Sequence, residues 1–157
     1  MKLIVISDTH GNINEAIDVI NNIENIDAIL HLGDYTKDAK EIEDKLNIEV
    51  INVKGNCDIS DKSTPEDKII EIKDKKFFLT HGHKYNVKWG INNIYYKAQE
   101  LMVDGVIFGH THKSINIREN DIVIFNPGSI TYPRGGSSRS YGIINVNKKI
   151  DANVIEL

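Results

Sequence analysis

The N-terminal third of the chain repeats one pattern three times: an apolar run followed by a polar loop. The apolar runs occupy residues 3–6, 28–32 and 50–53. A continuous apolar run of this length is typical of a central strand that is covered on both faces, whereas a half-exposed strand alternates apolar and polar residues. Apolar residues then recur with helical spacing between positions 13 and 23. The sequence therefore predicts strand–helix units that build a parallel sheet.

Two helices are expected to connect these strands. Asn12 and Glu15 resemble a capping box that would open the first helix. Thr36 is a candidate N-cap for the second helix, in which an apolar stripe runs through residues 39–46.

The remaining two thirds of the chain read as strands around one long helix. Residues 68–72 and 76–79 flank Asp74-Lys75, a candidate two-residue hairpin turn without the favoured glycine. Residues 87–102 have the clearest amphipathic pattern of the chain. Further strands are expected at residues 106–108, 114–118, 122–125, 141–146 and 150–155. Together these elements predict an α/β sandwich, in which two sheets pack together and the helices lie outside.

The composition limits the class of protein. The 157 residues fit one domain. Hydrophobic residues make up 40% and charged residues 27%, and no apolar run approaches the ~20 residues of a membrane helix, so a disordered or membrane-spanning protein is not expected. The net charge of −4 argues against a broad surface for a nucleic-acid polymer. A single cysteine, Cys57, allows no internal disulfide and suits the cytoplasm.

Residues that can bind metal ions follow five of the expected strands. The closest pair is His110 and His112, directly after the strand at 106–108. On its own this pair also fits solvated histidines in a turn. Ligands of open α/β sheets bind at the carboxyl ends of the strands, so the five segments are expected to converge. The candidate metal ligands are Asp8, His10, Asp34, Asn56, His81, His110 and His112.

The chemistry of this set points to two metal ions. Carboxylate, imidazole and amide oxygen suit Mn²⁺, Fe²⁺, Ni²⁺ or Zn²⁺, and the absence of a cysteine pair argues against a structural zinc site. Seven ligands exceed the needs of one four-coordinate ion. They fit two ions that share a carboxylate, which lie roughly 3.5–4 Å apart in such sites and stabilise the attacking and leaving oxygens of a displacement.

The same residues lie in motifs that resemble those of the calcineurin-like metallophosphoesterases. In chain order the motifs are Asp8-x-His10, Gly33-Asp34, Gly55-Asn56-Cys57-Asp58, His81-Gly82 and Gly109-His110-Thr111-His112. The short length, Cys57 and the segment Asn126-Pro127-Gly128-Ser129 are similar to the small prokaryotic phosphodiesterase branch. The resemblance implies a four-layer α/β/β/α sandwich of two mixed sheets flanked by helices. It also implies a single domain over residues 1–157, without a cap or accessory domain.

The resemblance further implies a binuclear site with a metal-bridging hydroxide as the nucleophile. The implied ligands are Asp8, His10, Asp34 and His112 for one ion, and Asp34, Asn56, His81 and His110 for the other, with Asp34 as the bridge. Two divalent cations are expected as cofactors. Mn²⁺ is the first expectation, and Ni²⁺, Fe²⁺ and Zn²⁺ are the alternatives.

Cys57 departs from the family pattern. Many members carry a histidine here, which stabilises the transition state or protonates the leaving oxygen. A thiol with a reference pKa of about 8.5 is neutral at pH 7 and cannot supply this positive charge, which favours activated esters or diesters as substrates. Asp34, Asn56, Cys57 and Asp58 are the expected catalytic residues. In relatives Asp58 would orient the histidine, and its task beside a cysteine is open.

Four other polar residues are candidates for either a structural or a substrate-binding role. His31 lies within an apolar strand and is expected to be a hydrogen-bonded core residue. His83 could contact substrate or solvent. Arg134 and Arg139 belong to a loop rich in glycine and serine, and they could bind an anionic substrate or lie in a solvated loop.

The sequence therefore predicts a cytoplasmic, metal-dependent phosphodiesterase that acts on a small diester. The alternatives are a nuclease, for which no basic strip is evident, and a non-catalytic interaction scaffold of the same fold, for which an eroded ligand set would be expected. A homodimer is the prior expectation for the assembly.

Overall fold

The computed structural model describes all residues 1–157 as ten strands, three α-helices and one 3-10 helix. The strands are β1 (Lys2–Ile6), β2 (Ala28–His31), β3 (Val50–Asn52), β4 (Asp67–Ile72), β5 (Lys75–Thr80), β6 (Gly105–Phe108), β7 (Ser114–Glu119), β8 (Ile122–Pro127), β9 (Ser140–Val146) and β10 (Ile150–Glu156). The helices are α1 (Asn14–Asn21), α2 (Thr36–Leu46), the 3-10 helix η1 (His83–Tyr85) and α3 (Asn92–Glu100).

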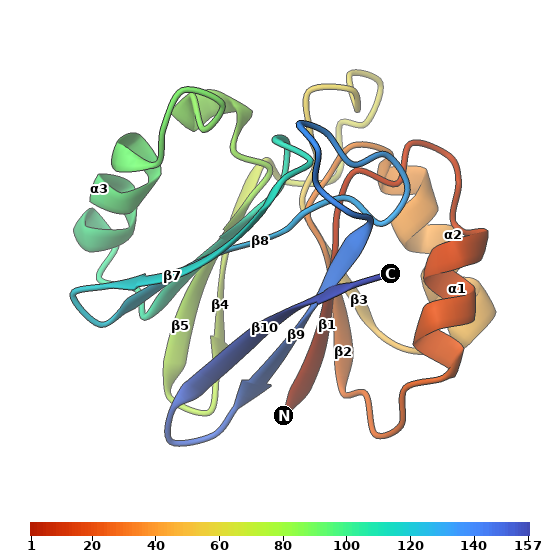
Figure 1. Cartoon of the computed structure of the whole chain (residues 1–157), viewed down its shortest axis with the longest axis horizontal. Helices are drawn as coiled ribbons and strands as arrows, with labels where there is room; N and C mark the ends of the chain where they lie inside the picture. Colours follow the sequence, from red (N-terminus) through yellow and green to blue (C-terminus); the bar gives the residue numbers. More distant parts are fainter.

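The strands form two five-stranded mixed sheets that pack face to face (Figure 1). The first sheet has the order β10-β9-β1-β2-β3, in which β1, β2 and β3 are parallel and β9 and β10 are antiparallel to their neighbours. The second has the order β4-β5-β6-β8-β7, with parallel β5, β6 and β8 between two antiparallel edge strands. Helices α1 and α2 cover the first sheet and α3 covers the second. The predicted four-layer α/β/β/α sandwich is confirmed.

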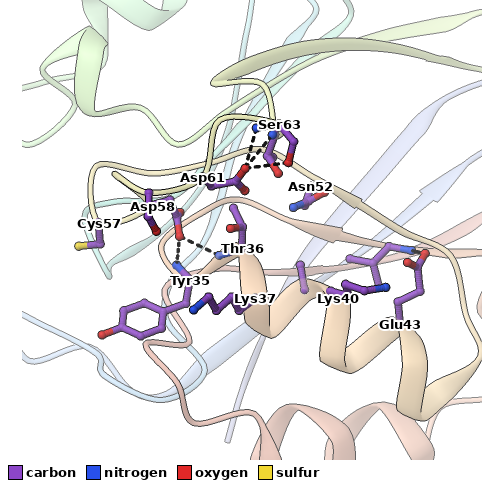
Figure 2. A pocket seen from close by; sticks show the side chains of 14 residues that line it. Tyr35, Thr36, Lys37, Lys40, Glu43, Asn52, Cys57, Asp58, Asp61 and Ser63 are labelled. Atoms are coloured by element: carbon purple, nitrogen blue, oxygen red, sulfur yellow. Dashed lines mark hydrogen bonds between the residues drawn. The ribbon is translucent and has the colours of Figure 1, made fainter.

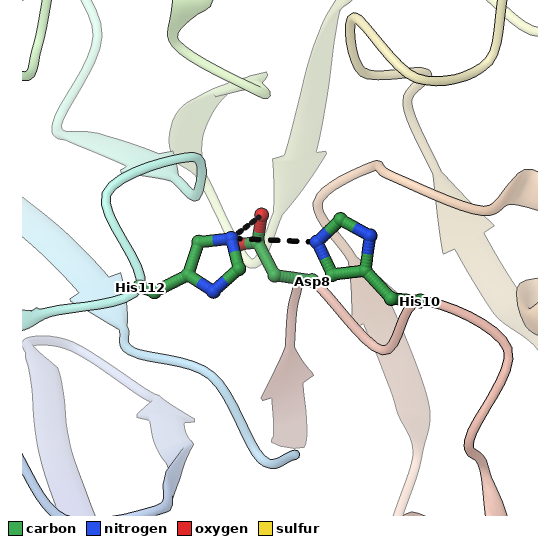
Figure 3. Close-up of side chains that lie close together, drawn as sticks. All are labelled: Asp8, His10 and His112. Atoms are coloured by element: carbon green, nitrogen blue, oxygen red, sulfur yellow. Dashed lines mark hydrogen bonds and ion pairs between the residues drawn. The ribbon is translucent and has the colours of Figure 1, made fainter. Parts of the chain in front are cut away.

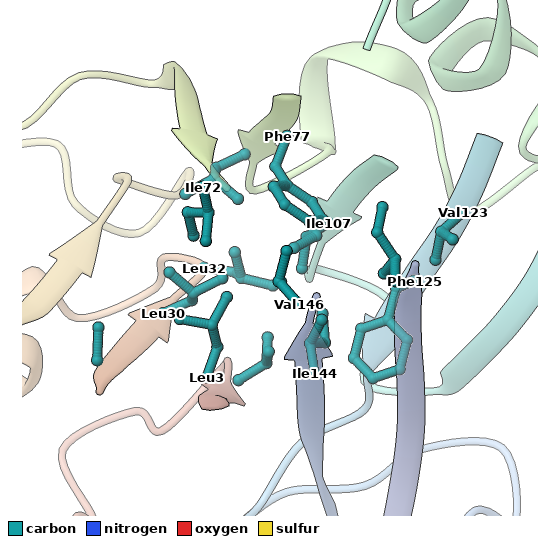
Figure 4. Packing of buried hydrophobic residues seen from close by; sticks show 14 of the residues in the cluster. Leu3, Leu30, Leu32, Ile72, Phe77, Ile107, Val123, Phe125, Ile144 and Val146 are labelled. Carbon is teal, nitrogen blue, oxygen red and sulfur yellow. The ribbon is translucent and has the colours of Figure 1, made fainter. Parts of the chain in front are cut away.

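Alternate residues of the central strands supply three apolar layers. Leu3 and Phe125 belong to the core between the two sheets (Figure 4). Their neighbours Ile4 and Ile124 point the other way, toward the helices that cover each sheet. Both faces of these strands are therefore buried, which explains the continuous apolar runs and fixes the strand register, because a slip of one residue would exchange the two faces.

The helix starts differ from the predictions. Helix α1 begins at Asn14 after Ile13 and has no side-chain cap, so the expected capping box of Asn12 and Glu15 does not form. Thr36 is the first residue of α2 rather than its cap. Its backbone N–H donates to the carboxylate of Asp58, which lies 22 residues further along the chain.

Two further local predictions were wrong in their boundaries. The hairpin turn consists of Lys73 and Asp74, both with left-handed φ angles of 48° and 64°, one residue earlier than expected. The helix expected over residues 87–102 begins only after Gly90, and Met102 is 83% exposed. None of the helices has the length and hydropathy needed to cross a membrane.

Candidate metal centre

Loops from both sheets meet at the carboxyl ends of the parallel strands. The N–H of Asp8 donates to the carbonyl of Gly33 at 3.3 Å, which joins the loops after β1 and β2. The N–H of Gly109 donates to the carbonyl of His81 at 3.2 Å and joins the loops after β5 and β6. The hydroxyl of Ser129 donates to the carbonyl of Asp8 at 3.0 Å and links the two sheets.

Five of the seven candidate ligands have a left-handed backbone, with φ between 48° and 67°. They are Asp8, His10, Asp34, His110 and His112. This conformation is uncommon for residues with a side chain and costs about 1–3 kcal/mol for each, so it persists only where the surrounding structure imposes it. Such strain is typical of functional sites.

Two glycines of the motifs are required by close approach. A Cβ at Gly55 would clash with the side chain and backbone of Asp34, and a Cβ at Gly109 would clash with the hydroxyl of Ser7. Neither position therefore tolerates a larger residue without movement of a loop that carries candidate ligands.

Asp8, His10 and His112 form the first cluster (Figure 3), with ligand atoms that all lie within 4.8 Å of one another. The Nε2 atoms of the two histidines are 3.4 Å apart. Nε2 of His112 is also 3.1 Å from Oδ1 of Asp8.

Asp34, His81 and His110 form the second cluster under the same distance limit. Nε2 of His81 lies 3.4 Å from Oδ1 of Asp34 and 3.1 Å from Nδ1 of His110. Oδ2 of Asp34 lies 3.7 Å from Nε2 of His10, a member of the first cluster. The two oxygens of Asp34 thus face different clusters, and His110 and His112 belong to different ones.

The arrangement fits metal binding on three grounds. Ligand atoms about 2.0–2.1 Å from one ion lie about 3.0–3.4 Å apart, which matches the nitrogen–nitrogen distances in both clusters. Nδ1 of His81 and Nδ1 of His112 lie 2.7 and 2.6 Å from backbone carbonyls. Because a carbonyl only accepts, these atoms carry the protons and leave each Nε2 free for a cation. Oδ1 of Asp8 is buried without a hydrogen bond.

Without a cation, the positive charge of the site belongs to His81: burial opposes protonation of its ring, but the hydrogen bond to Asp34 and the charges of Asp8 and Asp34 raise its pKa, and a bound cation would take the place of this proton. Burial raises the pKa of Asp34, but hydrogen bonding to His81 and the nearby charge of that ring outweigh burial and hold the pKa below its usual value. Burial, followed by the charge of His81, lowers the pKa of His110 to about 4, so its ring is neutral at pH 7. The site thus offers ionised carboxylates and a neutral imidazole.

Cys57 forms a further possible ligand group with His10 and Asp34, and Asn56 lies at the margin of the site. The thiol of Cys57 donates to Oδ2 of Asp34 at 3.3 Å, and burial together with this carboxylate raises the thiol pKa to about 11. Asn56 is exposed, and the one hydrogen bond of its amide is to the sulfur of Cys57 at 3.6 Å. The structure therefore brings together six of the seven candidate ligands and leaves the Asn56 side chain outside.

Asp58 is buried and binds only backbone groups. Its Oδ1 accepts from the N–H groups of Tyr35 and Thr36 at 2.9 and 2.8 Å, and its Oδ2 accepts from Gly55 at 2.8 Å. Asp58 thus fastens the loop after Asp34 to the loop before Asn56.

Asp38 and Asn126 hold two other loops, and neither side chain was predicted to do so from the sequence. Oδ2 of Asp38 accepts from the hydroxyl of Thr9 and the N–H of Gly11, the two neighbours of His10. The amide of Asn126 donates to the carbonyl of Gly109 at 2.8 Å. The signal for Asp38 in the sequence was slight, because a carboxylate in the first turn of a helix usually serves the helix itself.

His31 and His83 have different surroundings. His31 is fully buried, accepts from the N–H of Gly33 at 3.3 Å and lies 3.1 Å from the hydroxyl of Thr9, which confirms it as a hydrogen-bonded core residue. The ring of His83 lies 5.6 Å from that of His81, and its buried Nδ1 has no partner. His83 therefore lies beside the second cluster.

The two arginines of the loop before β9 have different surroundings. Arg139 forms an ion pair with Glu15 on α1 at 2.6 Å. Arg134 lines a hollow of about 570 Å³ together with His10, His112 and Tyr132. Of the two guanidinium groups, only that of Arg134 lies beside the first cluster.

Comparison with known proteins places these features in a family. Residues 1–149 match the family model of the calcineurin-like phosphoesterase superfamily domain. The chain is 34% identical to a phosphodiesterase of Methanocaldococcus jannaschii over 167 aligned residues, which cover 95% of each protein.

Solved structures have the same fold. A predicted phosphoesterase from Streptococcus pneumoniae has a TM-score of 0.83 at 28% identity, covering 99% of this chain and 88% of that one. The zinc complex of Vps29 from Entamoeba histolytica has a TM-score of 0.81 at 24% identity and covers 99% of both chains.

We expect Asp58→Ala to lower the free energy of unfolding by about 3 kcal/mol, because three N–H groups, two of them in buried hydrogen bonds, would lose a charged acceptor. Urea denaturation measures the change. Asp44→Ala is the matched control, since Asp44 lies on α2, is exposed and pairs only with Lys40 at 3.6 Å, so it should change stability by less than about 0.5 kcal/mol. Equal effects of the two substitutions would contradict the role given to Asp58.

Proposed function

We propose that this chain, which belongs to the calcineurin-like phosphoesterase superfamily, hydrolyses small phosphodiesters with two divalent metal ions. Its similarity to named phosphodiesterases over most of its length makes it a metal-dependent phosphodiesterase. The observation that carries the binuclear proposal is the pair of ligand clusters on either side of Asp34, whose Oδ1 lies 3.4 Å from His81 and whose Oδ2 lies 3.7 Å from His10.

The proposed ligand sets follow the two clusters. Asp8, His10 and His112 would hold one ion, His81 and His110 would hold the other, and Asp34 would bind both. The distances within each cluster and the buried, unpartnered oxygen of Asp8 support this assignment. Asn56 would bind the second ion after a rotation of its exposed side chain. Only the hydrogen bond to Cys57 restrains this rotation. We keep Mn²⁺ as the first expectation, with Ni²⁺, Fe²⁺ and Zn²⁺ as alternatives.

When bound, the two cations would supply a hydroxide nucleophile held between them and would neutralise charge on the phosphoryl oxygens. The protein's own side chains orient and support this chemistry. Asp34 would fix the distance between the two sites, and Asp58 would hold the loops of Asp34 and Asn56 in place. Cys57 would face the substrate as a neutral thiol, because the carboxylate of Asp34 opposes its ionisation.

The alternative function is a non-catalytic interaction scaffold of the same fold. Its support is likeness in fold alone, at 24% identity to Vps29. The candidate ligand positions are all filled with metal-binding residues, which favours catalysis. We also propose that residues 1–157 work as one domain, because the core between the sheets takes side chains from β1 through to β10. A homodimer stays a prediction.

Metal-loaded protein should hydrolyse bis(p-nitrophenyl) phosphate, an activated aryl diester. Treatment with a chelator should reduce the rate at least about 100-fold, because charge stabilisation at the phosphoryl group is lost, and added Mn²⁺ should restore it. Release of nitrophenolate measures the rate. Absence of turnover on any activated ester by metal-loaded protein would favour the scaffold.

His110→Ala and His112→Ala should each remove one ion, and not the same one. Wild-type protein should bind two ions per chain, each variant about one, and Asp34→Asn less than either. Elemental analysis gives the stoichiometry, and anomalous scattering shows which position is lost. His83→Ala is the control and should keep both ions, because His83 belongs to neither cluster. Loss of both ions in each single variant would argue for one shared site.

Cys57→His should raise phosphomonoesterase activity about tenfold or more, because an imidazolium near Asp34 can protonate a poor leaving group where a thiol cannot. The kcat for p-nitrophenyl phosphate and for an alkyl phosphate measures the gain, which should be larger for the alkyl ester. Cys57→Ser adds no positive charge and should bring no gain. No increase with histidine would show that proton donation at this position does not limit the rate.

A further inference from the structure

The hollow beside the first cluster is free of acidic side chains. It has a volume of about 570 Å³, which lies within the usual range for small-molecule sites, about 300–1,000 Å³. Two of the lining residues are candidate metal ligands and four belong to the loop before β9; they are His10, His112, Thr131, Tyr132, Pro133 and Arg134. The hollow therefore joins the proposed metal centre to a loop that carries a guanidinium group.

This loop is fastened to the first cluster by four hydrogen bonds. The hydroxyl of Ser129 donates to the carbonyl of Asp8 at 3.0 Å and accepts the N–H of Tyr132 at 2.8 Å. Nδ1 of His112 donates to the carbonyl of Tyr132 at 2.6 Å, and the N–H of Arg134 donates to the carbonyl of His112 at 3.2 Å. The backbone of Arg134 therefore has a fixed place relative to a candidate ligand.

Two positive charges at this place have no partner. The guanidinium of Arg134 is exposed and forms no ion pair or hydrogen bond within the protein. A Cβ at Gly135 would clash with the end of the Lys113 side chain, so the Lys113 ammonium lies beside the residue that follows Arg134. This ammonium also has no acidic partner. Two unpaired cations thus lie close together in a chain whose net charge is −4.

The acidic residues of the neighbouring elements are engaged by other groups. Glu15 on α1 pairs with Arg139, the second arginine of the loop. Oδ2 of Asp38 accepts from the hydroxyl of Thr9 and the N–H of Gly11. Neither carboxylate is therefore the partner of the two unpaired cations.

The proposed metal centre needs no further cation to bind a diester. The carboxylates of Asp8 and Asp34, the bridging hydroxide and the single negative charge of a phosphodiester would together balance two divalent cations. The charges of Arg134 and Lys113 remain over. They are therefore available for a second anionic group on the same ligand, for which a guanidinium is well suited.

We propose that the hollow binds a substituent of the phosphodiester that carries an anionic group of its own, which Arg134 and Lys113 contact. The proposal rests on the phosphodiesterase function proposed above. Tyr132 and Pro133 give the hollow an apolar wall, which suits the carbon skeleton between the phosphorus and the anionic group. The substrate class is thus a phosphodiester with an acidic group, a carboxylate or a phosphate, on one substituent.

The position of Cys57 indicates which substituent this is. Cys57 does not line the hollow; it lines a separate groove of about 630 Å³ between α2 and the loop of residues 57–64 (Figure 2). A histidine at this position is expected to protonate the leaving oxygen, which places the leaving group on the side of the groove. The hollow then takes the substituent that stays on the phosphorus.

The test uses p-nitrophenyl phenyl phosphates whose phenyl ring carries either a meta-carboxylate or the uncharged carboxamide of the same size. In both substrates nitrophenol is the better leaving group, and the other ring stays on the phosphorus. Wild-type protein should prefer the carboxylate about tenfold in kcat/KM, the size expected of two exposed contacts between opposite charges. The double variant Lys113→Gln/Arg134→Gln should bring the ratio of the two kcat/KM values close to one.

Arg139→Gln is the matched control, because it removes the same charge from the same loop, at a residue that Glu15 already neutralises. It should keep the wild-type ratio. An equal loss of the ratio in this variant would show a general effect of net charge and would overturn the proposal, as would a ratio that survives in the double variant. A third substrate with a meta-phosphonate distinguishes the two acidic groups, since the stronger preference identifies the natural one.

Equilibrium binding supplies a readout that does not depend on turnover. The probes are 3-carboxybenzylphosphonate and its carboxamide, whose carbon–phosphorus bond is not hydrolysed. By calorimetry, metal-loaded wild-type protein should bind the carboxylate about tenfold more tightly than the carboxamide, and the double variant should bind both alike. If none of the diesters is hydrolysed, the proposed function fails. If they are hydrolysed but the acidic group brings no preference in rate or binding, the function stands and the proposal for the hollow fails.

Discussion

The site depends on two aspartates whose carboxylates are removed from water at the ends of adjacent parallel strands. Asp8 and Asp34 follow β1 and β2, and both are buried. An ionised carboxylate in such a place is strongly destabilising unless opposite charge and hydrogen-bond donors surround it. The surrounding histidines and backbone N–H groups supply part of this compensation. The proposed cations would supply the rest.

The loops can keep strained conformations because the scaffold beneath them is rigid. The strands that deliver Asp8, Asp34, His81 and His110 are buried on both faces, so their ends are fixed in three dimensions. Asp38 and Asp58 then fasten the loops through backbone N–H groups. Because Asp38 lies within α2 and Asp58 binds its first turn, the helix couples the loop of His10 to the loops of Asp34 and Asn56.

The sequence predicted the architecture well because burial leaves a local trace. A strand covered on both faces must be apolar throughout, and residues 3–6 and 106–108 carry that signature without any neighbour being known. The convergence of the polar loop ends followed from sheet geometry. The features that were missed depend on partners far away in the sequence. Asp58 replaces a local cap for α2 from 22 residues away, and the groove exists only where α2 and a distant loop lie opposite each other. The position of the Lys73–Asp74 turn was missed because neither of its two left-handed residues is glycine or asparagine, the residues that usually mark such a turn.

The tight turn Lys73–Asp74 and its counterpart Asn120–Asp121 lie at the opposite end of the sheets from the ligand-bearing loops, since each precedes a strand that runs toward the site. The candidate ligands therefore lie at one end of the sheets, and tight turns that only connect strands lie at the other. Exposed turns of this kind are where proteins accept inserted segments. A fused reporter or a surface tether placed there would leave the loops of Asp8, Asp34 and His110 unchanged. The protein could therefore be immobilised through these turns.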